Sequence, residues 1–298
     1  MNLSRYFLLP DGRLRAGWRL AVFVVFFVIA LVAAGVAASL FVREPSVALE
    51  VGVLAVTTGA ATWLMMRFLE HESVLSIGLV LRQESFAEVR SGLGGGIALV
   101  GGMTVVEWGI GAIRFDGSGT TPAAALPYVV AMTALLSISA MTEEVLFRGY
   151  AFQRLVEGSG GPVAVAISSL VFGGLHAGNP YATRLSILNT MLAGALLALA
   201  YLKTRALWLP IGFHFSWNWT LLGLGHPVSG LEVAPMPWRA TPASELIWLH
   251  GGSYGPEGGV VATAALAVGI LYLAGQMKLL SPPSEIPSAP PPQEESTA

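Results

Sequence analysis

The sequence has no cysteine and few charged residues. The absence of cysteine excludes disulfide scaffolds, thiol nucleophiles and Cys-ligated zinc or iron–sulfur sites. Only 11% of the residues are charged, against roughly 25% in an average soluble domain, so a soluble globule of this size could not cover its surface. The net charge of −2 argues against a nucleic-acid partner held by bulk electrostatics. The bilayer must therefore be the solvent for most of the chain.

Long apolar runs fill most of the sequence. A spanning helix needs about 20 mostly apolar residues, and eight runs approach or exceed that length. We therefore predict an all-α, polytopic membrane protein of about eight transmembrane helices. The predicted spans are 18–41, 47–69, 92–113, 125–147, 162–179, 185–202, 207–225 and 257–277.

The distribution of basic residues predicts the orientation, because cytoplasmic loops carry an excess of Lys and Arg. With the N-terminus inside, twelve basic residues fall on the inner side and four on the outer side. Both termini are then cytoplasmic, and we expect a multi-pass protein of the plasma membrane. The inner residues are Arg5, Arg13, Arg15, Arg19, Arg67, Arg82, Arg90, Arg148, Arg154, Lys203, Arg205 and Lys278, and the outer ones are Arg43, Arg114, Arg184 and Arg239.

Three regions follow from composition. Residues 1–17 form a basic cytoplasmic N-terminus, 18–280 a single membrane domain, and 281–298 a Pro-, Ser- and Glu-rich tail that we expect to be disordered. Segment 226–256 is predicted as an outer loop lying partly at the interface.

Polar residues inside apolar spans are costly and therefore indicate function. They gather in four places: the run 143–149 (EEVLFRG), the run 172–176 (FGGLH), the run 214–218 (HFSWN) and the single Glu107. For Glu107 we favour a structural role, with its carboxylate hydrogen-bonded to a neighbouring helix or reaching the outer interface. The Glu70-His71-Glu72 run lacks a second metal-binding His, and we interpret it as a solvated helix end.

Helical spacing predicts different roles for the two glutamates of the run 143–149. Glu144 and Arg148 are four residues apart and therefore form an intrahelical ion pair. Glu143 points about 100° away and keeps its carboxylate free for another helix, as a general base requires. Glu143 precedes a turn at 158–162 by nearly the same number of residues as His176 follows it. An antiparallel helix hairpin therefore brings the two residues to one depth in the membrane. In the seventh span His214 and Asn218 share one helix face.

These residue types support two kinds of hydrolysis. Glu143 and His176 could activate a water molecule while His214 and Asn218 stabilise an oxyanion. Alternatively, Glu143, His176 and His214 could bind a divalent ion such as zinc that lowers the pKa of the water. The amide of Asn218 favours the metal-free version, because an amide is a poor zinc ligand but a good hydrogen-bond donor.

The three motifs resemble those of the CPBP intramembrane proteases, the CAAX-prenyl endopeptidase type II and Abi family. The resemblance rests on Glu143-Glu144 with Arg148, on Phe172 with His176, and on His214 with Asn218, and it covers about residues 120–225. It implies a helix-bundle protease with a membrane-embedded, cytosol-facing cavity. By the same resemblance Glu143, His176, His214 and Asn218 are catalytic, while Glu144, Arg148 and Phe172 support them.

The resemblance implies an endopeptidase for a membrane-associated protein or small peptide, and a CAAX-type substrate would be prenylated. The family has been described both as metalloproteases and as metal-free, glutamate-dependent enzymes, and the sequence leaves this open. A proton- or ion-coupled transporter is the main alternative function, because Glu, His and Arg in spans can also relay ions. A non-catalytic membrane scaffold is the other.

Overall fold

The computed structural model describes residues 4–43, 46–232 and 234–279, so the predicted tail 281–298 lies outside the described residues. The helices are α1 (Ser4–Phe7), α2 (Ala16–Ser39), α3 (Val47–Met65), α4 (Ser85–Gly109), α5 (Pro122–Arg148), α6 (Tyr150–Ser159), α7 (Gly161–Leu175), α8 (Arg184–Thr204), α9 (Trp208–Gly223), α10 (Ile247–His250) and α11 (Val260–Leu279). The strands are β1 (Ile113–Gly117) and β2 (Trp238–Pro242). Short turns of helix are η1 (Met66–Glu70), η2 (Val74–Ile77), η3 (His176–Gly178), η4 (Gly252–Tyr254) and η5 (Pro256–Gly258).

Seven helical stretches of the described chain are long and apolar enough to cross a membrane. Each overlaps a predicted span, and the eighth predicted span, 207–225, forms the 16-residue helix α9. The all-α, polytopic prediction is therefore confirmed. The seven stretches are Ala16–Ser39, Val47–Glu70, Ser85–Gly109, Pro122–Ser159, Gly161–Gly178, Arg184–Thr204 and Val260–Met277.

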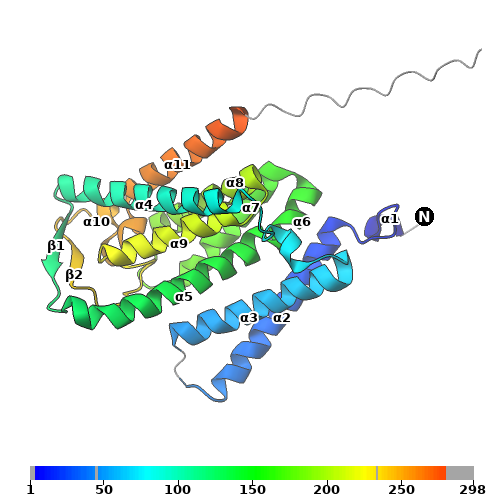
Figure 1. Ribbon diagram of the computed structural model, residues 1–298, viewed down its shortest axis with the longest axis horizontal. Helices are drawn as coiled ribbons and strands as arrows, with labels where there is room; N and C mark the ends of the chain where they lie inside the picture. The colour runs from blue at the N-terminus through cyan, green and yellow to red at the C-terminus, as the bar shows by residue number, and fades with distance from the viewer. Residues whose placement is uncertain (1–3, 44–45, 233, 280–298) are drawn as a thin grey trace, which may run out of the picture.

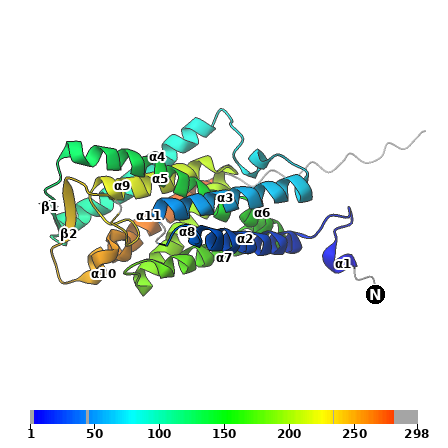
Figure 2. The same ribbon diagram turned by 90° about the horizontal axis from the view of Figure 1, so that it is seen from below.

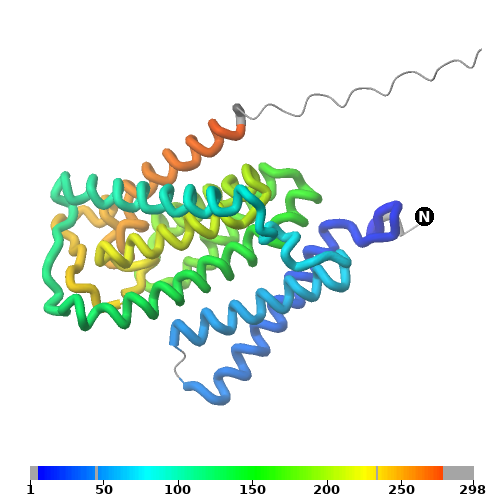
Figure 3. The backbone as a smooth tube through the Cα atoms, viewed as in Figure 1, coloured from blue at the N-terminus to red at the C-terminus, as the bar shows by residue number. Residues whose placement is uncertain are grey.

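The helices form an elongated bundle with two distinct ends (Figure 1). We call the end with β1, β2 and α10 the ribbon end, and the end with α6 and the start of α2 the terminal end. The tube in Figure 3 shows that α2 begins and α11 ends toward the terminal end. Helices α2 and α3 form a hairpin at the side of the bundle, where α3 packs on α5 and α2 on α6 (Figures 1 and 2).

A two-stranded ribbon closes the ribbon end, and the sequence analysis did not predict it. Strands β1 and β2 are antiparallel, with Ile113 opposite Pro242 and Gly117 opposite Trp238. The ribbon joins the connection that follows α4 to the connection that follows α9. It therefore fixes the predicted outer loop 226–256 over this end of the bundle.

Helices α4 and α9 approach closely because glycines line their contact. A Cβ atom at Gly92 would collide with the Leu209 carbonyl, and one at Gly96 would collide with the Ser216 hydroxyl. From the opposite side, a Cβ atom at Gly212 would lie 2.6 Å from the Val89 carbonyl oxygen. Small residues, such as those of the Gly-rich run 92–102, allow such backbone approach in lipid. This contact sets the position of α9, which carries the third motif.

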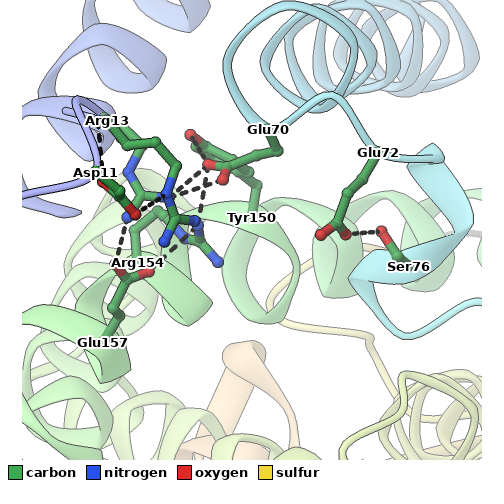
Figure 4. Close-up of polar contacts among 9 residues, drawn as sticks. Asp11, Arg13, Glu70, Glu72, Ser76, Tyr150, Arg154 and Glu157 are labelled. Carbon is green, nitrogen blue, oxygen red and sulfur yellow. Dashed lines mark hydrogen bonds and ion pairs between the residues drawn. The ribbon is translucent and has the colours of Figure 1, made fainter. Parts of the chain in front are cut away.

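A buried ion-pair cluster joins three segments at the terminal end (Figure 4). Arg19 of α2 is 1% exposed and donates two hydrogen bonds to Glu70, at 2.9 and 2.7 Å. Glu70 also accepts from the Tyr150 hydroxyl at 2.8 Å and pairs with Arg154 at 2.9 Å. Glu157 pairs with Arg19 and with Arg154. We call these five residues the Arg19–Glu70 cluster.

The cluster corrects one expectation. His71 and Glu72 are exposed, as predicted for a solvated helix end. Glu70 is not solvated: its side chain is 8% exposed and accepts hydrogen bonds from α2 and α6. The partners of Glu70 lie about 50 and 80 positions away in the sequence, so local composition carried no sign of this burial.

Candidate active site

Glu144 and Arg148 form the predicted intrahelical pair in the centre of the site. The Arg148 guanidinium donates to Glu144 Oε1 at 3.1 Å, and both side chains are fully buried. Arg148 also donates to the Gly194 carbonyl of α8 at 2.9 Å and lies 4.6 Å from the centre of the Phe172 ring of α7. The side chain of Arg148, which the sequence analysis counts among the inner basic residues, lies inside the bundle and connects α5, α7 and α8.

His214 adds a contact that the spacing rules did not predict. Its Nδ1 lies 2.8 Å from Glu144 Oε1. Since an ionised carboxylate only accepts hydrogen bonds, Nδ1 carries the proton of this contact. The other ring nitrogen, Nε2, lies 3.9 Å from Glu143 Oε2. His214 is therefore held by one glutamate and turned toward the other.

Glu143 faces away from Arg148, as helical spacing predicted. Its Oε1 accepts a hydrogen bond from the Ser139 hydroxyl at 3.0 Å. Its Oε2 is buried and has no hydrogen-bond partner among the described residues. One carboxylate oxygen of Glu143 is thus available beside His214.

His176 stands where α7 passes into η3. Its Nδ1 lies 2.7 Å from the Phe172 carbonyl oxygen, so Nδ1 donates and Nε2 is left free. The ring centres of Phe172 and His176 are 4.7 Å apart. Phe172 is 3% exposed and therefore fixes the ring by packing. The aromatic residue of the second motif thus orients the histidine that follows it one turn later.

All four predicted catalytic side chains line one cavity of about 240 Å³. Glu143 comes from α5, His176 from η3, and His214 and Asn218 from α9. The lining includes apolar residues of α3, α5, α8 and α11, and Ser229 and Glu257 from connections at the ribbon end. The structure therefore brings together the three motifs that the sequence placed at one depth.

Several polar residues of the cavity were missed, among them Ser139 and Glu257. Ser139 precedes Glu143 by one helical turn, so its hydrogen bond could have been predicted from spacing. Glu257 is the first residue of the last predicted span, 257–277, and nothing in its spacing ties it to the motifs. Its position in the cavity depends on how the connection 250–259 folds back over the bundle.

A second, larger cavity of about 690 Å³ lies at the ribbon end and contains none of the predicted site residues. It is lined by His226, among others, whose ring nitrogen lies 3.0 Å from the Thr104 hydroxyl. Burial lowers the pKa of His226 to about 4, so the ring is neutral at physiological pH. Leu231 lines both cavities, which are therefore neighbours.

Glu107 lies outside the cavity that contains Glu143 and corrects another expectation. Its side chain is completely buried, and neither carboxylate oxygen has a hydrogen-bond partner among the described residues. It is therefore neither bonded to a neighbouring helix nor in contact with the outer interface. The end of α4 lies beneath the ribbon, and that cover could not be inferred from hydropathy.

The arrangement does not fit a three-ligand metal site. Within the described ranges, no group of three or more His, Asp or Glu side chains converges on a common position. The Nδ1 atoms of His176 and His214 are engaged by Phe172 and Glu144, so each ring could offer only Nε2 to an ion. The predicted ligand set Glu143, His176 and His214 shares a cavity without forming a ligand cluster.

The fold and the cavity define a polytopic membrane protein with a buried glutamate–histidine centre. Residues 125–220 match the family described as Type II CAAX prenyl endopeptidase Rce1-like. This match supports the resemblance recognised from the three motifs, and the matched segment, about a third of the chain, runs from α5 to α9. This part of the chain is thus similar to a family of CAAX-type intramembrane endopeptidases. No curated protein and no solved structure matches the chain.

Proposed function

We propose that this protein hydrolyses peptide bonds of a membrane-associated protein or small peptide, with Glu143 as the general base. One observation carries the proposal. The unpartnered Oε2 of Glu143 faces His214 Nε2 at 3.9 Å in a cavity that His176 and Asn218 also line. A reacting water and carbonyl group need such a space between a base and hydrogen-bond donors.

In this mechanism Glu143 and the free Nε2 of His176 hold the water molecule. Glu143 takes its proton as the oxygen attacks the substrate carbonyl, and then gives the proton to the leaving amine. His214 and Asn218 donate hydrogen bonds to the developing oxyanion. His214 can donate at Nε2 only when both ring nitrogens carry protons, and Glu144 at 2.8 Å supplies the negative charge that such an imidazolium needs.

The protease core is proposed to span about 120–225, with the remaining helices forming the surrounding membrane domain. A prenylated CAAX-type protein is one substrate class consistent with the family. An unprenylated membrane peptide is the other, and a comparison of matched prenylated and unprenylated peptides separates the two.

The decisive variant is Glu143→Gln in purified protein reconstituted in nanodiscs. Loss of a general base lowers the rate by about 100- to 10,000-fold. The fold should persist, because the carboxylate makes one hydrogen bond, to Ser139. Glu84→Gln, an exposed residue at the start of α4, is the matched control and should keep full activity. Full activity of Glu143→Gln at normal expression would reject the assignment.

The same assay tests the metal-free version. Activity should survive a chelator, and His214→Gln should keep measurable residual activity, because Gln still donates a hydrogen bond. Stoichiometric zinc that disappears in His214→Gln, together with activity lost to chelator and restored by zinc, would contradict it.

A further inference from the structure

The cavity that contains Glu143 holds a second carboxylate from outside the three motifs. Glu257 belongs to η5, directly before α11, and its half-buried side chain lines the same cavity as Glu143 and His176. It lies outside the segment 125–220 that matches the family. Glu257 is therefore a cavity residue that the three motifs do not include.

The carboxylate of Glu257 is held in a fixed position by three donors. The Trp217 indole N–H donates to Oε1 at 2.9 Å. The backbone N–H and the hydroxyl of Ser229 donate to Oε2 at 2.6 and 3.1 Å. The Ser229 carbonyl in turn accepts from the Asn179 side chain at 3.1 Å. All three groups that contact the carboxylate are donors, which is the pattern that an ionised carboxylate accepts.

The backbone that carries Glu257 is fixed as well. Asn189 of α8 is 2% exposed, and its side-chain amide donates to the carbonyls of Glu257 and Gly259, both at 2.8 Å. The Asn189 oxygen accepts from the Thr263 hydroxyl of α11 at 2.7 Å. The carboxylate therefore cannot withdraw from the cavity without breaking bonds to α8, α9 and the loop at Ser229.

No positive side chain of the described residues balances this charge. Glu144 is paired with Arg148, and Glu143 faces His214. Glu257 has no ion-pair partner in the described chain, and none of the described residues lining the cavity is Lys or Arg. In a cavity walled by apolar helices, an unbalanced charge acts strongly on any charged group that enters.

We infer that Glu257 is a specificity-determining residue that selects substrates with a basic residue near the scissile bond. The inference rests on the proposed function, because it concerns what enters the cavity of Glu143. A Lys or Arg side chain, or a free amine, meets the negative wall favourably. A carboxylate at the same place is repelled. The favoured substrate thus has a basic residue close to the cleaved bond.

The test uses one membrane-anchored peptide sequence in which Lys, Gln or Glu is placed at successive positions around the cleaved bond. Each peptide is made with a C-terminal amide and with a free carboxylate. At one position wild type should prefer Lys over Glu by about tenfold or more in kcat/KM, since like-charge contacts in a desolvated site are strongly disfavoured. Glu257→Gln should reduce this ratio to within about threefold, because only the charge is removed.

The control is Glu232→Gln, an exposed carboxylate at the rim of the neighbouring cavity, which should leave the preference unchanged. If Glu257→Gln does not fold, Leu231→Lys places a positive charge on the same wall and should weaken the preference for Lys. An unchanged Lys-to-Glu ratio in the folded variants, or no preference in wild type, overturns the inference.

Peptide binding is measured in parallel by fluorescence anisotropy, so the two proposals can fail separately. If wild type binds Lys peptides more tightly than Glu peptides but hydrolyses none, the charge selection stands and the protease function fails. If wild type hydrolyses all peptides equally, the protease function stands and the role of Glu257 fails.

Discussion

Glu144 accepts from Arg148 and from His214 through the same oxygen, so one buried carboxylate holds two motifs together. Removing its charge leaves the Arg148 guanidinium fully buried without a counter-charge. Breaking a buried pair by removing one partner costs about 3–5 kcal/mol. The residue therefore matters for the fold before it matters for the reaction.

We predict that Glu144→Gln lowers both the melting temperature and the activity. The stability loss should be about 3–5 kcal/mol, and the activity falls because His214 loses the negative charge beside Nδ1. Thermal unfolding of the Glu143→Gln and Glu144→Gln variants tests this prediction. Glu143→Gln should melt near wild type, and identical melting of both variants would contradict the division of roles between the two glutamates.

Glu107 leads to the opposite expectation. A buried carboxylate without a hydrogen-bond partner among the described residues is costly, and replacing such groups by apolar ones of similar volume is neutral or stabilising. We predict that Glu107→Met melts at or above the wild-type temperature and keeps full activity. Glu50→Met, in the first turn of α3, is the control for added apolar surface. Loss of activity without loss of stability would show that Glu107 serves the reaction.

Sequence could predict contacts within one helix, because helical geometry is local. The Glu144–Arg148 pair and the separate direction of Glu143 follow from spacing alone and agree with the structure. The contact of His214 with Glu144 joins residues 70 positions apart. The place of Glu257 depends on a connection folding back over the bundle, which no spacing rule contains.

At the scale of elements, hydropathy located the helices but not their packing. The eight apolar runs predicted eight helices, because burying backbone groups in lipid requires helical hydrogen bonding. The strands β1 and β2 escaped prediction, because each has five residues and pairs with a segment far away in the sequence. The close contact between α4 and α9 depends on glycines such as Gly92, Gly96 and Gly212, and hydropathy alone does not identify which helices pack together.

We predict that Gly96→Ala destabilises the protein and lowers its activity, because the new Cβ would collide with the Ser216 hydroxyl and push α9 away. Overpacking of this kind costs about 1–3 kcal/mol. Gly94→Ala lies on the same helix with nothing within 4 Å of its Cβ, and it should be neutral. Melting temperature and kcat/KM are measured for both variants. If Gly96→Ala and Gly94→Ala have the same melting temperature and the same kcat/KM, the α4–α9 contact does not position His214.

At the scale of the whole molecule, the cavity draws its lining residues from the ribbon end of the bundle more than from the terminal end. Its described lining includes ribbon-end residues such as Asn179, Ser229 and Glu257, and none from the terminal-end connections 66–84, 149–160 or 205–207. The basic residues are concentrated at the other end. Arg19 and Arg148 are buried in ion pairs, but the remaining basic residues still favour the terminal end. The positive-inside rule then makes the terminal end cytoplasmic, whereas the family resemblance implies a cytosol-facing cavity.

Because the chain has no cysteine, each introduced cysteine is a unique label that can decide the orientation. Glu84→Cys exposes a thiol near the terminal end and Glu245→Cys exposes one at the ribbon end. Following the charge rule, we expect a membrane-impermeant maleimide to label Glu245→Cys in intact cells and Glu84→Cys only after permeabilisation. Substrate would then reach the ribbon-end wall of the cavity from the non-cytoplasmic side. The reverse labelling would place both termini outside and the wall containing Glu257 toward the cytosol, so that cytosolic peptides supply the basic segment.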